Sequence, residues 1–213
     1  MDNAIELPEE LQDYIFASSE PVHPVVRRII AETQAMPERS MQITPDEAIF
    51  LRAMVRLIRP EAILEIGTFT GLSSLIMAGA MVDGGRMTCL DISDEFTAIA
   101  RQAWAEARVA DRIDLIIGPA LESIAHLDGP FQLVFIDADK ENLQAYVEAV
   151  IPKVPQGGVV MVDNTLWRRQ VITDDASPST VTIRAFNQWL VAHPAFDVEM
   201  VGIADGLTLA IKK

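Results

Sequence analysis

Apolar residues in the first part of the chain recur at helical spacing. Valine and isoleucine over residues 22–30 fall on one helical face. A further helix has a defined start, because Thr44 is a favoured N-cap, Pro45 suits the first helical position and Glu47 completes a capping box. The pattern therefore predicts a helical extension over residues 1–60.

From residue 61 the pattern changes to short apolar runs, each followed by a polar turn and an amphipathic segment. Buried strands that alternate with helices are typical of a parallel sheet covered on both faces. A closing hairpin with an Asp205-Gly206 turn predicts one antiparallel strand in that sheet. We expect a single domain, 1–213, with the α/β core at 61–213. The predicted strands are 62–66, 86–90, 112–117, 131–136, 158–162, 196–203 and 207–211.

Composition and charge exclude several classes of protein. With 213 residues, 50% of them hydrophobic and 23% charged, the chain is typical of one globular domain. No apolar run approaches the roughly 20 residues of a membrane helix. The net charge of −14 repels nucleic-acid phosphates and anionic membranes. We expect neither as a partner.

Two further features bear on the compartment. The single cysteine, Cys89, excludes an internal disulfide framework and suits a reducing environment. The first residues, Met1–Glu6, are acidic and lack the apolar core of a signal peptide. We therefore expect a cytoplasmic protein.

The turn after the first predicted strand reads Glu65-Ile-Gly-Thr-Phe-Thr-Gly71, and Gly67 would allow close approach of a ligand. The turn lacks the third glycine of the dinucleotide fingerprint, which favours a nucleoside-like cofactor without a pyrophosphate. An ordinary glycine turn is the alternative. Asp91, at the end of the second strand, can accept both ribose hydroxyls, or it can be a charge at the start of the next helix.

Polar side chains also follow two later strands. The segment Phe135–Lys140 (FIDADK) contains Asp137, and Asp163 and Asn164 follow the next strand. Each segment alone could be a turn or a helix cap. Together they supply hard oxygen ligands for Mg²⁺, Mn²⁺ or Ca²⁺.

These motifs carry a family resemblance. From about residue 41 to the C-terminus the chain is similar to the cation-dependent class I O-methyltransferases, the group of caffeoyl-CoA and catechol O-methyltransferases. The matching segments are EIGTFTGLS (65–73), GPA (118–120), FIDADK (135–140), DNTLW (163–167) and ADGL (204–207).

The resemblance implies a Rossmann-like fold with a mostly parallel seven-stranded sheet, one antiparallel strand and helices on both faces. It implies S-adenosylmethionine as cofactor and a divalent cation, Mg²⁺ before Mn²⁺ or Ca²⁺. Lys140 and Asp137 would be catalytic, with Lys140 the general base. The cation ligands would be Asp137, Asp163 and Asn164. The cofactor contacts would be Met41, Glu65, Gly67, Thr68, Ser73, Asp91, Ala120, Asp137 and Asp139.

The implied reaction methylates one hydroxyl of a small aromatic vicinal diol, by in-line transfer to a metal-bound phenolate, in a homodimer. Plant members carry Asn-Gly where this chain has Arg168-Arg169. Arg168 could meet an anionic substrate or offset nearby acidity, and Trp167 could stack on the acceptor or pack on the rim. The alternatives are a metal-independent methyltransferase of the same fold or an NAD-dependent oxidoreductase, against which the missing third glycine and the closing hairpin argue.

Overall fold

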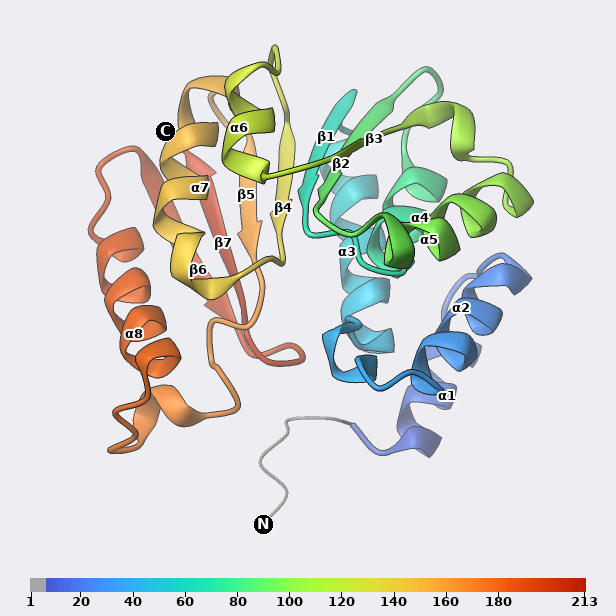
Figure 1. The fold of residues 1–213 in the computed structure, drawn as a ribbon, viewed down its shortest axis with the longest axis horizontal. Coiled ribbons are helices and arrows are strands. Elements are labelled where there is room, and N and C mark those ends of the chain that lie inside the picture. Colours follow the sequence, from blue (N-terminus) through green and yellow to red (C-terminus); the bar gives the residue numbers. More distant parts are fainter. Residues whose placement is uncertain (1–6) are drawn as a thin grey trace.

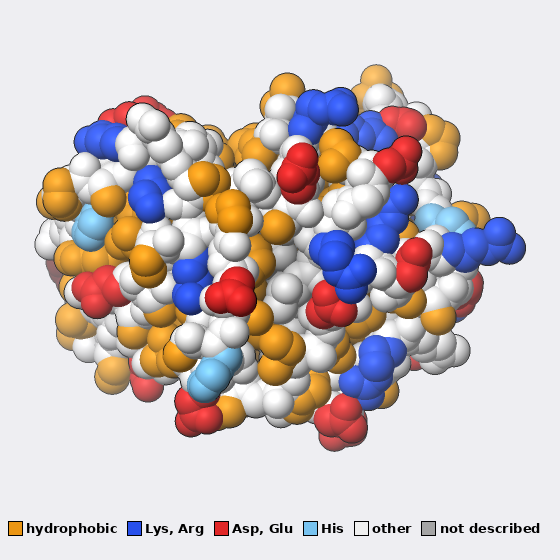
Figure 2. All heavy atoms as spheres, turned by 90° about the horizontal axis from the view of Figure 1, so that it is seen from above, with side chains coloured by type: hydrophobic (Ala, Val, Ile, Leu, Met, Phe, Trp, Pro, Cys, Tyr) orange, Lys and Arg blue, Asp and Glu red, His pale blue; other side chains and the backbone are white. Residues whose placement is uncertain are grey.

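The computed structural model describes residues 7–213. Met1–Glu6, on which the expectation about a signal peptide rests, lie outside the described residues. Within the described part, every helix is too short or too polar to cross a membrane. On the face in Figure 2, acidic and basic side chains are interspersed among apolar ones.

From residue 7 onward the N-terminal extension is mostly helical. It contains α1 (Glu9–Ala17), α2 (Pro24–Gln34), the 3₁₀ turn η1 (Arg39–Met41) and α3 (Pro45–Ile58). The apolar stripe of α2 and that of α3 both pack into one core, which explains the helical spacing in the sequence.

One local prediction about this extension is wrong. The capping box at the start of α3 is not formed, because the Thr44 side chain makes no cap hydrogen bond. The Glu47 side chain is instead buried, with 1% of its surface exposed. The inward orientation of Glu47 removes the partner that a capping box needs.

The strands form one sheet in the order β3-β2-β1-β4-β5-β7-β6. The neighbouring pairs among β1 to β5 are parallel, whereas β7 runs antiparallel to both β5 and β6. The prediction of one antiparallel strand is therefore confirmed. The strands are β1 (Ala62–Ile66), β2 (Arg86–Asp91), β3 (Ile113–Ile117), β4 (Leu133–Ile136), β5 (Val159–Val162), β6 (Phe196–Val201) and β7 (Leu207–Lys212).

Helices cover both faces of the sheet (Figure 1). One hydrophobic core joins the sheet to α2, α3, α4 and α5, and the other joins it to α6, α7 and α8. The short helix α6 was not anticipated from the sequence. The remaining elements are α4 (Leu72–Ala80), α5 (Asp94–Glu106), α6 (Ala120–Ala125), α7 (Leu143–Val150), α8 (Pro178–Val191), η2 (Ala110–Arg112), η3 (Lys140–Asn142), η4 (Ile151–Lys153) and η5 (Gln170–Ile172).

The strand order reverses between β1 and β4, which are hydrogen-bonded neighbours at the centre of the sheet. In open α/β sheets, ligands bind at the carboxyl ends of the strands beside such a switch point. The ends of β1, β2, β4 and β5 and the loops that follow them carry the polar motifs found in the sequence. The topology therefore gathers these motifs at one edge.

Candidate active site

The glycine loop after β1 lies against the loop after β4. Gly67 has a φ of +91°, and a β-carbon there would come within 2.0 Å of the Asp137 carbonyl oxygen. Only glycine accommodates both the left-handed backbone and this contact. The predicted cofactor loop and the predicted cation ligand are therefore in direct backbone contact.

Asp91 organises the same loop from β2. Its Oδ2 accepts hydrogen bonds from the backbone N–H groups of Thr68 at 2.9 Å and Phe69 at 2.7 Å. Its Oδ1 accepts one from Ser93 N–H at 2.8 Å. Asp91 thus touches both the predicted cofactor loop and the start of α5.

Glu65 is fully buried beneath the loop. Ser73 Oγ donates to Glu65 Oε1 at 2.6 Å, and Thr68 Oγ1 donates to Oε2 at 2.9 Å. Burial raises the pKa of Glu65 to about 7, although both hydroxyl donors oppose this shift. Both side-chain oxygens of Glu65 thus accept hydrogen bonds from within the protein. The predicted residues Glu65, Thr68 and Ser73 form one cluster.

The N-terminal extension reaches this loop through Thr70. Thr33 Oγ1, buried on α2, donates to Thr70 Oγ1 at 2.9 Å, and Gln42 Nε2 donates to the same oxygen at 3.4 Å. Met41, the predicted cofactor cover, precedes Gln42 and is 53% exposed. The sequence did not single out Thr33, because a threonine within a helix has no distinctive pattern.

The predicted cation ligands meet at the ends of β4 and β5. Asp163 is 2% exposed, and its carboxylate accepts Asn164 N–H at 2.6 Å and Asn164 Nδ2 at 2.9 Å. Lys140 Nζ lies 3.3 Å from Asp137 Oδ1. Burial raises the pKa of Asp163 to about 8; the Asp137 charge adds to the shift and the Lys140 charge opposes it.

Glu47 is a residue that sequence reasoning missed. Its buried carboxyl group lies beside Asp163, and its Oε1 has no hydrogen-bond partner. Burial, together with the negative charges of Asp163 and Asp137, raises the pKa of Glu47 well above its usual range. The sequence pattern assigned Glu47 to helix capping, because capping is the common role of a glutamate in the first turn of a helix.

The donor chemistry of this cluster fits a hard divalent cation. No group of three or more His, Cys, Asp or Glu side chains within residues 7–213 is close enough to form a metal site. The predicted set instead combines two carboxylates with the amide of Asn164. Positive charge nearby stabilises buried carboxyl groups that repel each other, and Lys140 already supplies one such charge beside Asp137. Asp137, Asp163 and Asn164 are thus suited to hold such an ion.

Asp139 is held on both oxygens. Tyr146 Oη donates to Oδ1 at 2.5 Å, and Asn142 Nδ2 donates to Oδ2 at 2.6 Å. Burial raises the pKa of Tyr146, and its bond to Asp139 raises it further. Neither Tyr146 nor Asn142 was predicted, although both fix the orientation of a predicted cofactor contact.

The remaining predicted residues lie at the start of α6 and on the loop after β5. Gly118 N–H donates to the Asp91 carbonyl at 2.9 Å, which brings the segment before half-buried Ala120 to the end of β2. Trp167 packs partly against the second core. Arg168 is exposed, and its backbone N–H donates to Asp205 Oδ1 at 2.5 Å.

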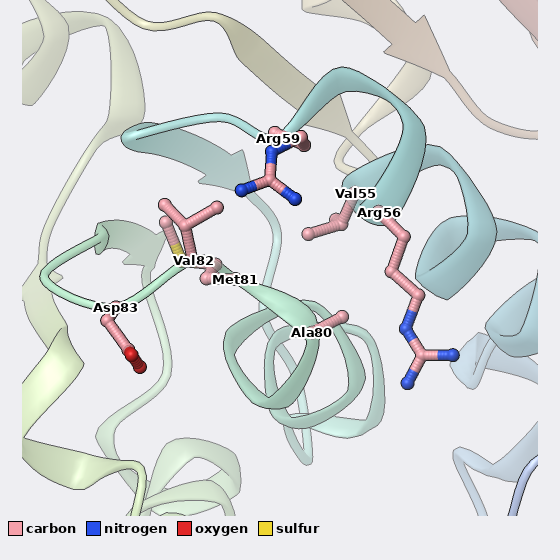
Figure 3. Close-up of a pocket in the computed structure, with 7 residues that line it drawn as sticks. All are labelled: Val55, Arg56, Arg59, Ala80, Met81, Val82 and Asp83. Atoms are coloured by element: carbon pink, nitrogen blue, oxygen red, sulfur yellow. The ribbon is translucent and has the colours of Figure 1, made fainter.

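Two cavities lie away from these motifs. One, of about 360 Å³, opens where α3 and α4 end and is lined by Arg56, Arg59 and Asp83 among others (Figure 3). The other, of about 310 Å³, lies against α8, β6 and β7. Neither is lined by a predicted site residue.

Comparison with known proteins defines the class. A family model described as O-methyltransferase matches residues 16–213. A caffeoyl-CoA O-methyltransferase from Eucalyptus gunnii is 34% identical, over 94% of this chain and 86% of that protein. A catechol O-methyltransferase from Mycobacterium tuberculosis is 32% identical, over 88% of each chain. The crystal structure of an O-methyltransferase from Bacillus cereus in complex with SAH superposes with a TM-score of 0.87 at 28% identity, covering 96% of this chain and 97% of that one.

The fold, the strand-end motifs and these matches agree. The chain belongs to the O-methyltransferase family, within the caffeoyl-CoA and catechol group. It is an S-adenosylmethionine-dependent O-methyltransferase, and the resemblance inferred from the sequence is confirmed.

Proposed function

We propose that this enzyme requires a divalent cation and methylates one hydroxyl of a vicinal diphenol. The observation that carries the proposal is the meeting of Asp137, Asp163 and Asn164 at adjacent strand ends, beside Lys140. An oxygen-rich, buried and acidic cluster of this kind favours Mg²⁺, with Mn²⁺ or Ca²⁺ as alternatives.

Asp137, Asp163 and Asn164 would hold the cation, which when bound lowers the pKa of a phenolic hydroxyl. Lys140 would receive the proton at Nζ; for this it must be a neutral amine rather than the partner of Asp137. Its limited exposure, 12% of the side chain, restricts competing water.

The cofactor side of the site is proposed to follow the glycine loop. Glu65, Thr68 and Ser73 shape the loop, Gly67 lets the loop pack against the Asp137 backbone, and Asp91 lies at its edge. We assign Met41, Ala120 and Asp139 to the surrounding cofactor contacts, and Trp167 and Arg168 to the acceptor side. Alignment of the methyl group with the acceptor oxygen would supply the larger part of catalysis, up to roughly 7–11 kcal/mol.

The test is methyl transfer from labelled S-adenosylmethionine to vicinal diphenols, with monophenols of the same ring as matched controls. Each reaction is run with Mg²⁺, with Mn²⁺ or Ca²⁺, and with excess chelator. We expect transfer to the diphenols alone, abolished by chelator and restored by metal. Chelator-insensitive transfer would favour the metal-independent alternative. Transfer to monophenols at equal rates would contradict the proposed acceptor.

The oligomeric state and the cellular location of the enzyme are predictions. We expect a homodimer, which sedimentation of the purified enzyme would test. A cytoplasmic location is expected from the sequence and would be tested by cell fractionation.

A further inference from the structure

Glu47 is a buried carboxyl group whose Oε1 meets no hydrogen-bond donor. It stands in the first turn of α3, in the N-terminal extension rather than in the α/β core, and is 1% exposed. Thr44, the residue that it would pair with in a capping box, makes no cap bond. Helix initiation therefore does not account for the inward orientation of Glu47.

Its surroundings are acidic. The carboxyl group of Glu47 lies within hydrogen-bonding reach of Asp163, and the charges that act on it, from Asp163, Asp137 and Asp46, are all negative. Its Oε1 is buried without a hydrogen-bond partner. Burial of an unpaired polar atom beside like charges is unfavourable. A buried carboxyl group with an unpaired oxygen, next to the polar residues at the ends of β4 and β5, points to a positively charged ligand nearby.

We propose that Glu47 is a positioning residue of the divalent-cation site: its buried carboxyl group contacts Asp163 from the N-terminal extension and orients that ligand. This inference rests on the cation in the proposed function. Glu47 is not assigned as a ligand, since it does not form a three-carboxylate ligand group with Asp137 and Asp163. Groups that orient metal ligands typically change metal affinity about 10–100-fold when they are removed.

One consequence concerns the extension itself. Because Glu47 contacts Asp163 across the boundary between α3 and the core, cation binding would fasten the first turn of α3 against the end of β5. Packing of the first turn of α3 and formation of the cation site would then be coupled.

The experiment measures binding of Mn²⁺ to the full-length protein by electron paramagnetic resonance, without methyl donor or acceptor. Glu47→Gln keeps the shape of the side chain and replaces the carboxyl group that contacts Asp163 with an amide. Asp46→Asn is the matched control, because it makes the same carboxyl-to-amide change one residue away on the same turn. We expect Glu47→Gln to raise the Mn²⁺ Kd about 10–100-fold and Asp46→Asn to leave it unchanged. Equal Mn²⁺ affinity in the wild type and Glu47→Gln would overturn the inference.

A second measurement needs no substitution. Hydrogen exchange of the wild type is compared with and without Mg²⁺, and we expect the ion to slow exchange in the first turn of α3 as well as after β4 and β5. Slowing confined to the two strand ends would also overturn the role of Glu47. If the wild type binds no Mn²⁺ at all, the metal dependence in the proposed function fails, a result distinct from loss of the Glu47 effect alone.

Discussion

Gly67 and Asp137 are in backbone contact: a β-carbon at position 67 would lie 2.0 Å from the Asp137 carbonyl oxygen. The loop predicted to hold the methyl donor is therefore in direct contact with a residue predicted to hold the cation. A change on either side is transmitted to the other by steric contact.

Gly67→Ala should be strongly destabilising, because it combines a clash with backbone atoms and a φ of +91°. We expect the free energy of unfolding to fall by roughly 3 kcal/mol or more, as measured by urea denaturation. Gly79→Ala is the control, since it lies in α4 with open space around it, and it should stabilise by about 0.5–1 kcal/mol. Equal effects of the two substitutions would refute the contact.

Asp163→Ala should remove metal-dependent methyl transfer, because the variant loses the more buried of the two proposed carboxylate ligands. The check is the initial rate at saturating Mg²⁺, with folding verified by circular dichroism. Asp197→Ala, which changes an exposed partner of Lys213, serves as control. Wild-type activity in Asp163→Ala would eliminate the proposed role of Asp163.

Lys140→Ala should weaken activity without abolishing it. A positioned base typically contributes about 10²–10⁴-fold to the rate. Because the cation would already favour loss of the proton, we expect the rate to fall by about 10²-fold. Lys140→Arg retains a positive charge near Asp137 but cannot serve as a neutral base. Full activity in Lys140→Arg would show that only the charge matters.

The stability of the protein should depend on pH through Glu65. Its pKa rises from 4.5 to about 7 in the folded state, so the native protein binds more protons than the unfolded chain between these values. Stability contributed by protonated Glu65 is therefore lost as the pH rises through that window, by up to about 3 kcal/mol. Glu65→Gln should reduce the difference in unfolding free energy between about pH 5 and about pH 8. An unchanged difference would contradict the assignment to Glu65.

Thr33→Val should weaken binding of S-adenosylhomocysteine, because it removes the buried hydroxyl that fixes Thr70 in the glycine loop. Loss of one neutral hydrogen bond of about 0.5–1.5 kcal/mol predicts a Kd raised about 2–12-fold by calorimetry. Thr33→Ser should restore affinity. Thr208→Val removes another buried threonine pair, with Thr165, and should leave this Kd unchanged. Equal Kd values for Thr33→Val and wild type would dismiss the role of Thr33.

The sequence by itself determined the α/β class and most strand positions, because period and composition are local properties. The apolar run Ala62–Ile66 coincides with β1 in full. Asp91 belongs to the end of β2, while Asp137 and Asp163 directly follow β4 and β5, so parallel topology predicts that all three lie at one edge.

The tertiary structure decided the contacts between distant segments. Glu47 resembles a helix-capping residue in sequence, yet packing of α3 turns it toward Asp163. Thr33 and Thr70 come together only because α2 packs on the core beside the glycine loop. Such contacts depend on how helices pack rather than on local pattern, since burial and partners arise from the whole fold. For that reason the sequence predicted the proposed ligands, and only the fold revealed the residues that support them.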